Sequence, residues 1–186
     1  MSKLLILSAG VSEDSNNTKL AKKLNKFLNE EGIRNEIYEN LHENIPFLLD
    51  NQNDVPKKIL EMRESLESAN KIIIFSPVYN GGFLAHLKNT LDWLSLSYDG
   101  FKYNSLFKDK KVGVITSVRG GGGNAQNAFN ILSAQLINYG LRVFEEFHLI
   151  TNKEHQVDIE IDENHKVFEN IVQYVNRFLN FLFVIN

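Results

Sequence analysis

A chain of 186 residues, 43% of them hydrophobic and 23% charged, has the size and composition of one globular domain with a full core. Its net charge of -3 gives no electrostatic basis for binding nucleic acid or an anionic membrane surface. The sequence has no cysteine, which excludes disulfides, thiolate metal ligands and thiol chemistry, so a redox function would need a bound cofactor. The apolar runs at both ends are too short for a signal peptide or a membrane span, and we therefore expect a cytoplasmic protein.

Short apolar runs alternate with amphipathic segments along the whole chain. Strands are predicted at residues 3–8, 34–40, 71–76, 111–117 and 141–149. Helices, where apolar residues recur every three or four positions, are predicted at 15–31, 57–69, 84–97, 124–138 and 167–182. This alternation predicts a single doubly wound α/β domain over residues 1–186 with a parallel sheet, although periodicity does not give the strand order. In such sheets, ligands bind beyond the carboxyl ends of the strands.

The loop after the first predicted strand, "SAGVSEDSNNTKLA", places hydroxyl and amide side chains at the start of a helix. The free N–H groups and the dipole at a helix N-terminus favour an anion there. A simpler interpretation is that Ser15 is an N-cap whose hydroxyl satisfies the first helical turn. Neither a Walker loop nor a Rossmann glycine fingerprint is present.

The loop after the third strand, "SPVYNGG", combines a rigid proline with two glycines that permit close backbone approach. Tyr79 and Asn80 lie between them and could present an aromatic face and a polar edge to a flat ligand. The alternative is a simple turn, because Pro, Asn and Gly are common turn residues. A turn alone leaves the large Tyr79 unexplained.

The loop after the fourth strand, "SVRGGGGNAQNA", contains four consecutive glycines. Ordering them costs much conformational entropy, which a ligand bound by bare amides could offset; a flexible surface loop is the alternative. Arg119 is the loop's one cation, and either contacts a nicotinamide phosphate or lies in solvent. The three loops are expected to share one edge of the sheet, which favours a common binding site.

The stretch "SPVYNGGFLAHLKNTLDWLS" resembles the NADPH-dependent FMN reductase family, which includes flavodoxin-like quinone, azo-dye and chromate reductases. The family motif P-E-Y-N-G-S-x-P-x-x-L-K-N-x-x-D-W-x-S is matched at Pro77, Tyr79, Asn80, Gly81, Leu87, Lys88, Asn89, Asp92, Trp93 and Ser95. The resemblance implies a flavodoxin-like three-layer sandwich with a five-stranded parallel sheet in the order 2-1-3-4-5 and helices on both faces.

The resemblance also implies where FMN would bind. Its phosphate would lie near Gly10, Ser12, Ser15, Asn16 and Asn17. Its isoalloxazine ring would lie against Pro77, Val78, Tyr79, Asn80 and Gly81, with Ser117, Gly120 and Gly121 at the ring edge. Two positions depart from the family pattern: Ser12 stands where arginine is common, and Val78 replaces a glutamate. Loss of the arginine should weaken phosphate binding by about 1–3 kcal/mol.

The implied activity is hydride transfer from NADPH or NADH to bound FMN, and then to a quinone, free flavin or similar small acceptor. No side chain is assigned as catalytic, but Asn80 and the amides of Gly120 and Gly121 are expected to polarise the N1–C2=O region of the flavin. Members of the family usually form homodimers, and often homotetramers, through the helices that correspond to 84–97 and 124–138 here.

Two other functions stay open at this point. The chain could be a flavodoxin-like, FMN-binding electron carrier without a nicotinamide site, although its charge of -3 is mild for a carrier that docks electrostatically. It could also be a non-flavin binding protein that has lost the phosphate site. The five histidines lack metal-ligand spacing and are interpreted as surface or packing residues. Lys88 and Asp92 are expected to form a helix-surface pair, and Trp93 to lie in the core or an interface.

Overall fold

The computed structural model describes residues 3–12, 14–49, 54–98, 100–118, 120, 122–151 and 166–181. Its strands are β1 (Lys3–Ser8), β2 (Asn35–Tyr38), β3 (Ala69–Phe75), β4 (Lys111–Ser117) and β5 (Arg142–Ile150). Its helices are α1 (Asn16–Glu30), α2 (Lys57–Ser68), α3 (Ala85–Ser95), α4 (Ala125–Asn138) and α6 (Lys166–Leu179). All neighbouring strands are parallel, in the order β2-β1-β3-β4-β5, which confirms the predicted flavodoxin-like topology.

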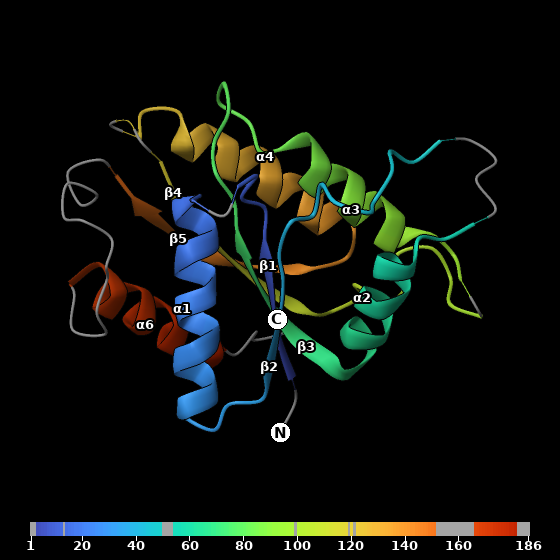
Figure 1. Cartoon of the computed structure of the whole chain (residues 1–186), viewed down its shortest axis with the longest axis horizontal. Coiled ribbons are helices and arrows are strands. Elements are labelled where there is room, and N and C mark those ends of the chain that lie inside the picture. Colours follow the sequence, from blue (N-terminus) through green and yellow to red (C-terminus); the bar gives the residue numbers. More distant parts are fainter. Residues whose placement is uncertain are drawn as a thin grey trace, which may run out of the picture.

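The sheet is the middle of three layers (Figure 1). Helices α1 and α6 cover one face, and α2, α3 and α4 cover the other. Residues 4–8 of β1 are buried throughout, as expected for a central strand with helices on both faces. The two apolar layers on either side of the sheet hold the strand ends, and therefore the loops that follow them, in fixed positions.

The observed element boundaries lie within three residues of the predicted ones, with two informative differences. Ala69, predicted as the last residue of a helix, begins β3 instead, because its backbone is already extended after Ser68. Ile131, one of the apolar residues whose spacing indicates the helix at 124–138, is nevertheless 46% exposed. The buried stripe of α4 runs through Ala128, Leu132 and Leu136, and Ile131 lies beside that stripe rather than within it.

The pairing of β4 with β5 is irregular, and Tyr174 of α6 compensates for the irregularity. The register shifts between Val112 and Val114, so regular ladder bonds are interrupted there. The Tyr174 hydroxyl accepts a hydrogen bond from the Val114 N–H at 2.9 Å and donates one to the Glu146 carbonyl at 3.3 Å. A Cβ atom on Gly113 would lie 2.8 Å from this hydroxyl, so the strand needs glycine at that position.

Tyr174→Phe is expected to lower the free energy of unfolding by about 1–3 kcal/mol, because it leaves the Val114 N–H and the Glu146 carbonyl without this partner. Urea denaturation followed by circular dichroism measures the change. Tyr103→Phe is the matched control, since Tyr103 is exposed. Equal unfolding midpoints for the two variants would contradict the bridging role of Tyr174.

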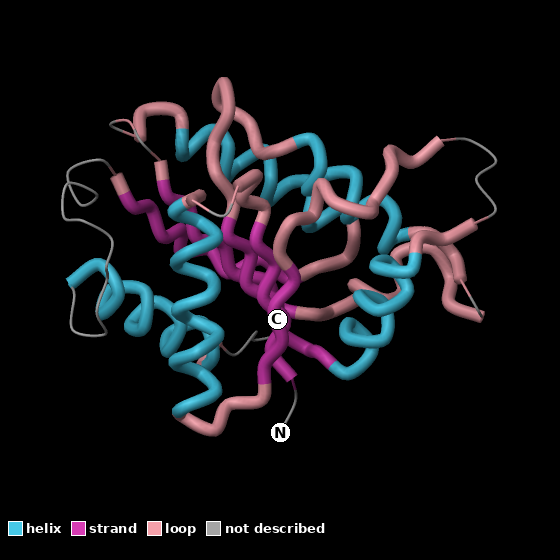
Figure 2. Tube along the Cα trace, in the orientation of Figure 1, coloured by secondary structure: helices cyan, strands magenta, loops and turns pink. Residues whose placement is uncertain are grey.

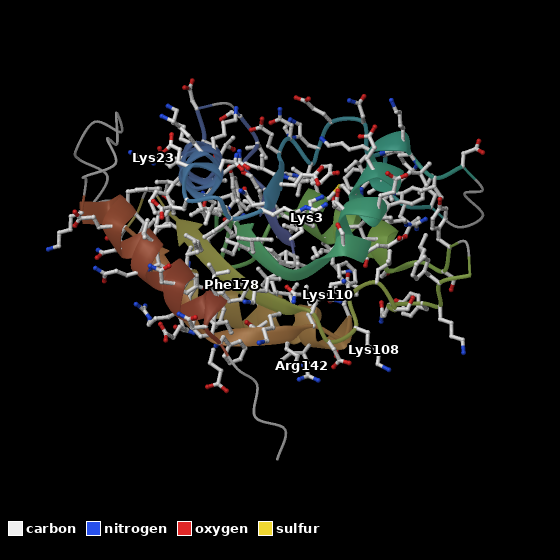
Figure 3. The ribbon with its side chains drawn as sticks, turned by 90° about the horizontal axis from the view of Figure 1, so that it is seen from below. Lys3, Lys23, Lys108, Lys110, Arg142 and Phe178 are labelled. Carbon is white, nitrogen blue, oxygen red and sulfur yellow. The ribbon has the colours of Figure 1, made fainter. Side chains whose placement is uncertain are left out.

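Lysines at the edge where the strands begin hold the C-terminal ends of helices. Lys110 donates to the carbonyl of Ala69, the residue directly after α2, and Lys71 donates to the carbonyl of Leu179, the last residue of α6. Cations at helix C-termini complement the helix dipole. Figure 3 looks onto this edge, with Lys3, Lys110 and Arg142 in view. Lys71 and Lys110 therefore have structural partners, and they lie at the edge of the sheet opposite the predicted ligand loops.

Helix α3 holds the loop that precedes α2. Trp93 is fully buried, and its indole N–H donates to the Pro46 carbonyl at 2.8 Å, which places it in the core, one of the two positions predicted for it. Asn89 donates to the same carbonyl at 3.0 Å. The predicted Lys88–Asp92 pair is present at 2.6 Å, and the Tyr139 hydroxyl of the segment after α4 also donates to Asp92.

Candidate functional site

The loops after β1, β3 and β4 gather at the edge of the sheet where these strands end (Figure 2). Two adjoining hollows lie among them and share Val78 and Val118. The first has a volume of about 340 Å³ and the second about 440 Å³. Together they form an elongated site at the switch between β1 and β3, the position where doubly wound folds bind ligands.

The first hollow brings together most of the residues predicted around a phosphate and one side of a ring. Its lining consists of Val11, Ser12, Ser15, Asn16, Asn17, Pro77, Val78, Tyr79, Ser117 and Val118. None of these described residues is charged, and Ser12 stands at the position where the family pattern commonly has an arginine. An anion in this hollow would be bound by hydroxyl groups, amides and the start of α1 rather than by a cation.

Ser15 is the N-cap of α1, as one of the two sequence interpretations predicted. Its hydroxyl, however, makes no capping hydrogen bond to the first helical turn. The Ser15 N–H donates to the Ser12 carbonyl at 3.0 Å, which closes a tight turn before the helix. A hydroxyl that lines the hollow without capping the helix is suited to a ligand's phosphate oxygens.

Gly10, predicted near the FMN phosphate, is not among the residues that line the first hollow. A Cβ atom at this position would lie 2.1 Å from the Thr18 Oγ1 and 2.5 Å from the Ser15 Oγ. Thr18 is fully buried and accepts a hydrogen bond from the Ser8 hydroxyl at 3.2 Å. The glycine therefore lets the loop pack closely against the start of α1.

The side chain of Asn17 connects two of the three loops. Its Nδ2 donates to the Ser117 carbonyl, and its Oδ1 accepts from the Ser117 N–H, both at 3.0 Å. Asn17 is buried, and this pair of hydrogen bonds ties the first turn of α1 to the end of β4. Asn17 and Ser117, both predicted cofactor contacts, thus lie together at the first hollow, where the Asn17 side-chain amide is hydrogen-bonded to the Ser117 backbone.

The second hollow is lined by Val78, Asn80, Gly81, Val118, Gly120, Gly122, Gly123, Asn124 and Ala125. Asn80 and Gly81 have φ angles of 50° and 77°, and Tyr79 and Gly82 exchange hydrogen bonds at 3.0 and 2.9 Å. These are the features of a two-residue type I′ turn, so the turn interpretation is correct for the backbone. Tyr79 stays 53% exposed and lines the first hollow, where its ring is available to a ligand.

Several lining residues escaped the sequence reasoning, among them Val11, Val118 and Asn124. The two valines carry no chemical signal in a sequence, and their role as apolar walls follows only from the loop geometry. In the described part of the glycine loop, Gly122 alone has a positive φ, 77°, and a Cβ there would lie 2.9 Å from the Leu149 Cδ2. Gly121, a predicted cofactor contact, and Arg119, for which a nicotinamide contact and solvent exposure were both open, lie outside the described residues.

His86, in the first turn of α3, contacts the loop after β1 and was interpreted from the sequence as a surface or packing residue. Its Nε2–H donates to the Ala9 carbonyl at 3.3 Å, and its ring lies 5.7 Å from that of His42. Burial lowers the pKa of His86; the hydrogen bond to Ala9 opposes this effect, and the charge of His42 adds to it. The neutral imidazole is therefore favoured in the folded protein.

This lowered pKa predicts that acid destabilises the fold through His86. The unfolded chain binds a proton at a pKa of about 6.5, and the folded chain only at lower pH, so stability falls as the pH drops below about 6.5. His86→Gln should reduce the decrease in unfolding midpoint between about pH 7.5 and pH 5.5. The same decrease in both proteins would show that His86 does not cause it.

No cluster of three or more His, Cys, Asp or Glu suited to a metal ion occurs among the described residues. In the same part of the chain, no helix combines the length and apolarity that crossing a membrane requires.

The fold is flavodoxin-like, and its site consists of two adjoining hollows: one lined by hydroxyl and amide side chains and by Tyr79 at the start of α1, the other lined largely by glycines. The model of the NADPH-dependent FMN reductase family matches residues 2–154, and the chain belongs to this family. A curated relative, the FMN-dependent NADH:quinone oxidoreductase of Burkholderia pseudomallei (strain 1710b), is 39% identical over 75 residues. That match covers 38% of this chain and only 37% of the relative's length.

Similar solved structures agree on the fold. The flavoenzyme FerB, an NAD(P)H:(acceptor) oxidoreductase from Paracoccus denitrificans, superposes with a TM-score of 0.77 at 21% identity, covering 97% of this chain and 96% of FerB. The NAD(P)H:quinone oxidoreductase from Methanothermobacter marburgensis gives a TM-score of 0.70 at 16% identity and covers 100% and 99%. At such identities, the similarity establishes the shared flavodoxin-like architecture.

Proposed function

We propose that this chain is an FMN-dependent NAD(P)H oxidoreductase that passes a hydride from a nicotinamide, through bound FMN, to a quinone, free flavin or similar small acceptor. The observation that carries the proposal is the pair of adjoining hollows, one at the start of a helix and one between a turn and a glycine loop. Their arrangement matches the shape of FMN, which has a phosphate at one end and a flat ring with polar edges at the other.

The residues present fit the phosphate end of FMN. The hydroxyls of Ser12 and Ser15 and the backbone amides at the start of α1 would donate to the phosphate oxygens. With no charged side chain in the described lining, this binding is weaker than with the arginine that the family usually has. We therefore expect FMN to be held less tightly than in relatives with that arginine, yet tightly enough to stay bound through desalting at low salt.

The ring end would be held by walls of different chemistry. Val78 and Val118, shared by the two hollows, would exclude water from one side of the ring. The exposed Tyr79 would stack near its edge, and Asn80 together with the glycine-loop amides would face its polar atoms. When bound, FMN supplies the hydride chemistry, so the chain needs no acid–base residue and its task is orientation.

The proposal includes self-association as a homodimer or homotetramer through α3 and α4. On α4, Ile131 and Ile137 are 46% and 59% exposed, which leaves apolar surface available for a second copy. Light scattering on the purified protein tests this part, and a monomer at micromolar concentration would contradict it. A cytoplasmic location stays a prediction of the sequence.

The activity is tested by following NADPH and NADH oxidation with a simple quinone in the presence and absence of added FMN. The proposal predicts turnover that requires protein, flavin and nicotinamide together. A rate no higher than that of free FMN with the same reagents would contradict a reductase function. Flavin binding with no reaction towards either nicotinamide would instead support an electron carrier.

A further inference from the structure

The turn that forms one wall of the second hollow is held from outside by helix α4. Asn127, in the first turn of α4, donates from its Nδ2 to the Gly81 carbonyl at 2.9 Å. The N–H of Gly82, on the same peptide group, donates to the Tyr79 carbonyl at 2.9 Å. The peptide between Gly81 and Gly82 is therefore hydrogen-bonded at both ends, which fixes its orientation.

The turn has little local support of its own. Its two strands are reduced to a single bridge between Tyr79 and Gly82, and both central residues have positive φ. Isolated two-stranded turns are marginally stable in water, so the contact from α4 supplies much of what holds this one. A Cβ built on Gly81 would lie 3.5 Å from the Asn127 Nδ2 and 3.8 Å from the Asn124 Cβ, so α4 also packs closely against the turn.

The contact joins two walls of one hollow. The Asn80–Gly81 turn follows β3, whereas the glycine loop and the start of α4 follow β4. Asn127 connects them across 46 residues of sequence, beside the region where we place the polar edge of the flavin ring. We therefore expect loss of this bond to alter the spacing between the two walls.

We propose that Asn127 is a positioning residue that sets the placement of the flavin ring by holding the Asn80–Gly81 turn against α4. This role rests on the proposed function, because it concerns the same cofactor. Asn127 acts through Gly81, and it is the Gly81 carbonyl that receives its hydrogen bond. Asn127 bonds the turn after β3, whereas the proposed phosphate end is formed by Ser12, Ser15 and the start of α1.

The test compares Asn127→Ala and Asn127→Asp with the wild type, using FMN and riboflavin as separate ligands. Asn127→Ala should lower the affinity for both flavins by the same factor, about fivefold. The substitution removes the hydrogen bond that holds the turn beside the ring, and it leaves the phosphate end unchanged. Asn127→Asp should weaken both further, because an aspartate oxygen would face the Gly81 carbonyl oxygen. The reduction potential of bound FMN should shift in both variants.

Asn130→Ala is the matched control, because Asn130 is exposed on the same helix and accepts a bond from Gln126 only one turn away. It should bind both flavins as the wild type does. A flavin-free measurement completes the set: hydrogen exchange at the Gly82 amide should be about fivefold faster in Asn127→Ala than in Asn130→Ala.

Two outcomes are distinguishable. If the wild type binds flavin, but Asn127→Ala matches it in flavin affinity, reduction potential and Gly82 exchange, the positioning role is overturned and the reductase function stands. If the wild type binds neither FMN nor riboflavin, the proposed function fails and the positioning role fails with it. Equal loss of both flavins together with faster Gly82 exchange is the result we expect.

Discussion

Replacing Ser15 by glutamate is expected to lower the affinity for FMN about 100-fold or more while leaving the fold intact. Ser15 lines the first hollow at the N-cap of α1, so a carboxylate there would lie near the proposed phosphate position. Two unit charges about 6 Å apart, at an effective dielectric constant of about 20, repel by roughly 3 kcal/mol. An acidic side chain is favourable at a helix N-terminus, so the unfolding midpoint should not fall. Isothermal titration with FMN measures the loss.

Riboflavin and Ser15→Ala are the controls for this variant. Riboflavin lacks the phosphate, so its affinity should be nearly the same in the wild type and in Ser15→Glu. Ser15→Ala removes one hydroxyl without adding charge and should weaken FMN about fivefold. Wild-type FMN affinity in Ser15→Glu would mean that the phosphate does not lie at the start of α1.

Replacing Gly10 by alanine is expected to destabilise the fold and the site together. The added methyl would lie 2.1 Å from the Thr18 Oγ1, and Thr18 is fully buried and hydrogen-bonded to Ser8. The loop or the start of α1 must therefore move, at a cost of about 1–3 kcal/mol for an overpacked site. Urea denaturation of the flavin-free protein measures the stability, and FMN titration should show a parallel loss of binding.

Gly120→Ala is the matched control for stability. A Cβ atom at Gly120 meets nothing within 4 Å, and its φ is not positive. This variant should stay within about 0.5 kcal/mol of the wild type, as surface substitutions usually do. Equal stability for Gly10→Ala and Gly120→Ala would show that the close approach at Gly10 is not required.

The fold could be predicted from the sequence because its signals are local and repeated. The apolar run of β1 and the spacing of Leu87, Leu91 and Leu94 in α3 each indicate an element by themselves. The strand order could not be obtained in this way, since register and crossover depend on packing between distant segments. It came from the family resemblance, and the observed order β2-β1-β3-β4-β5 confirms it.

The site was predictable as a set of loops but not as a set of contacts. The carboxyl ends of β1, β3 and β4 had to meet at one edge of a parallel sheet, which brought Ser15, Tyr79 and Gly120 to adjoining hollows. The bonds of Asn17 to Ser117 span 100 residues, and that of Asn127 to Gly81 spans 46. Asparagine occurs throughout this sequence, so nothing local distinguishes those that connect loops from those in solvent.

The central claim, that this chain holds FMN and reduces it with a nicotinamide, is tested most directly by one spectroscopic experiment. The purified protein is mixed with FMN, desalted, and titrated with NADPH or NADH without oxygen while the visible flavin absorption is recorded. We predict that flavin absorption is retained after desalting at low salt and is bleached by at least one of the two nucleotides. A protein that emerges without flavin, or whose retained flavin is bleached by neither nucleotide, would contradict the proposed reductase.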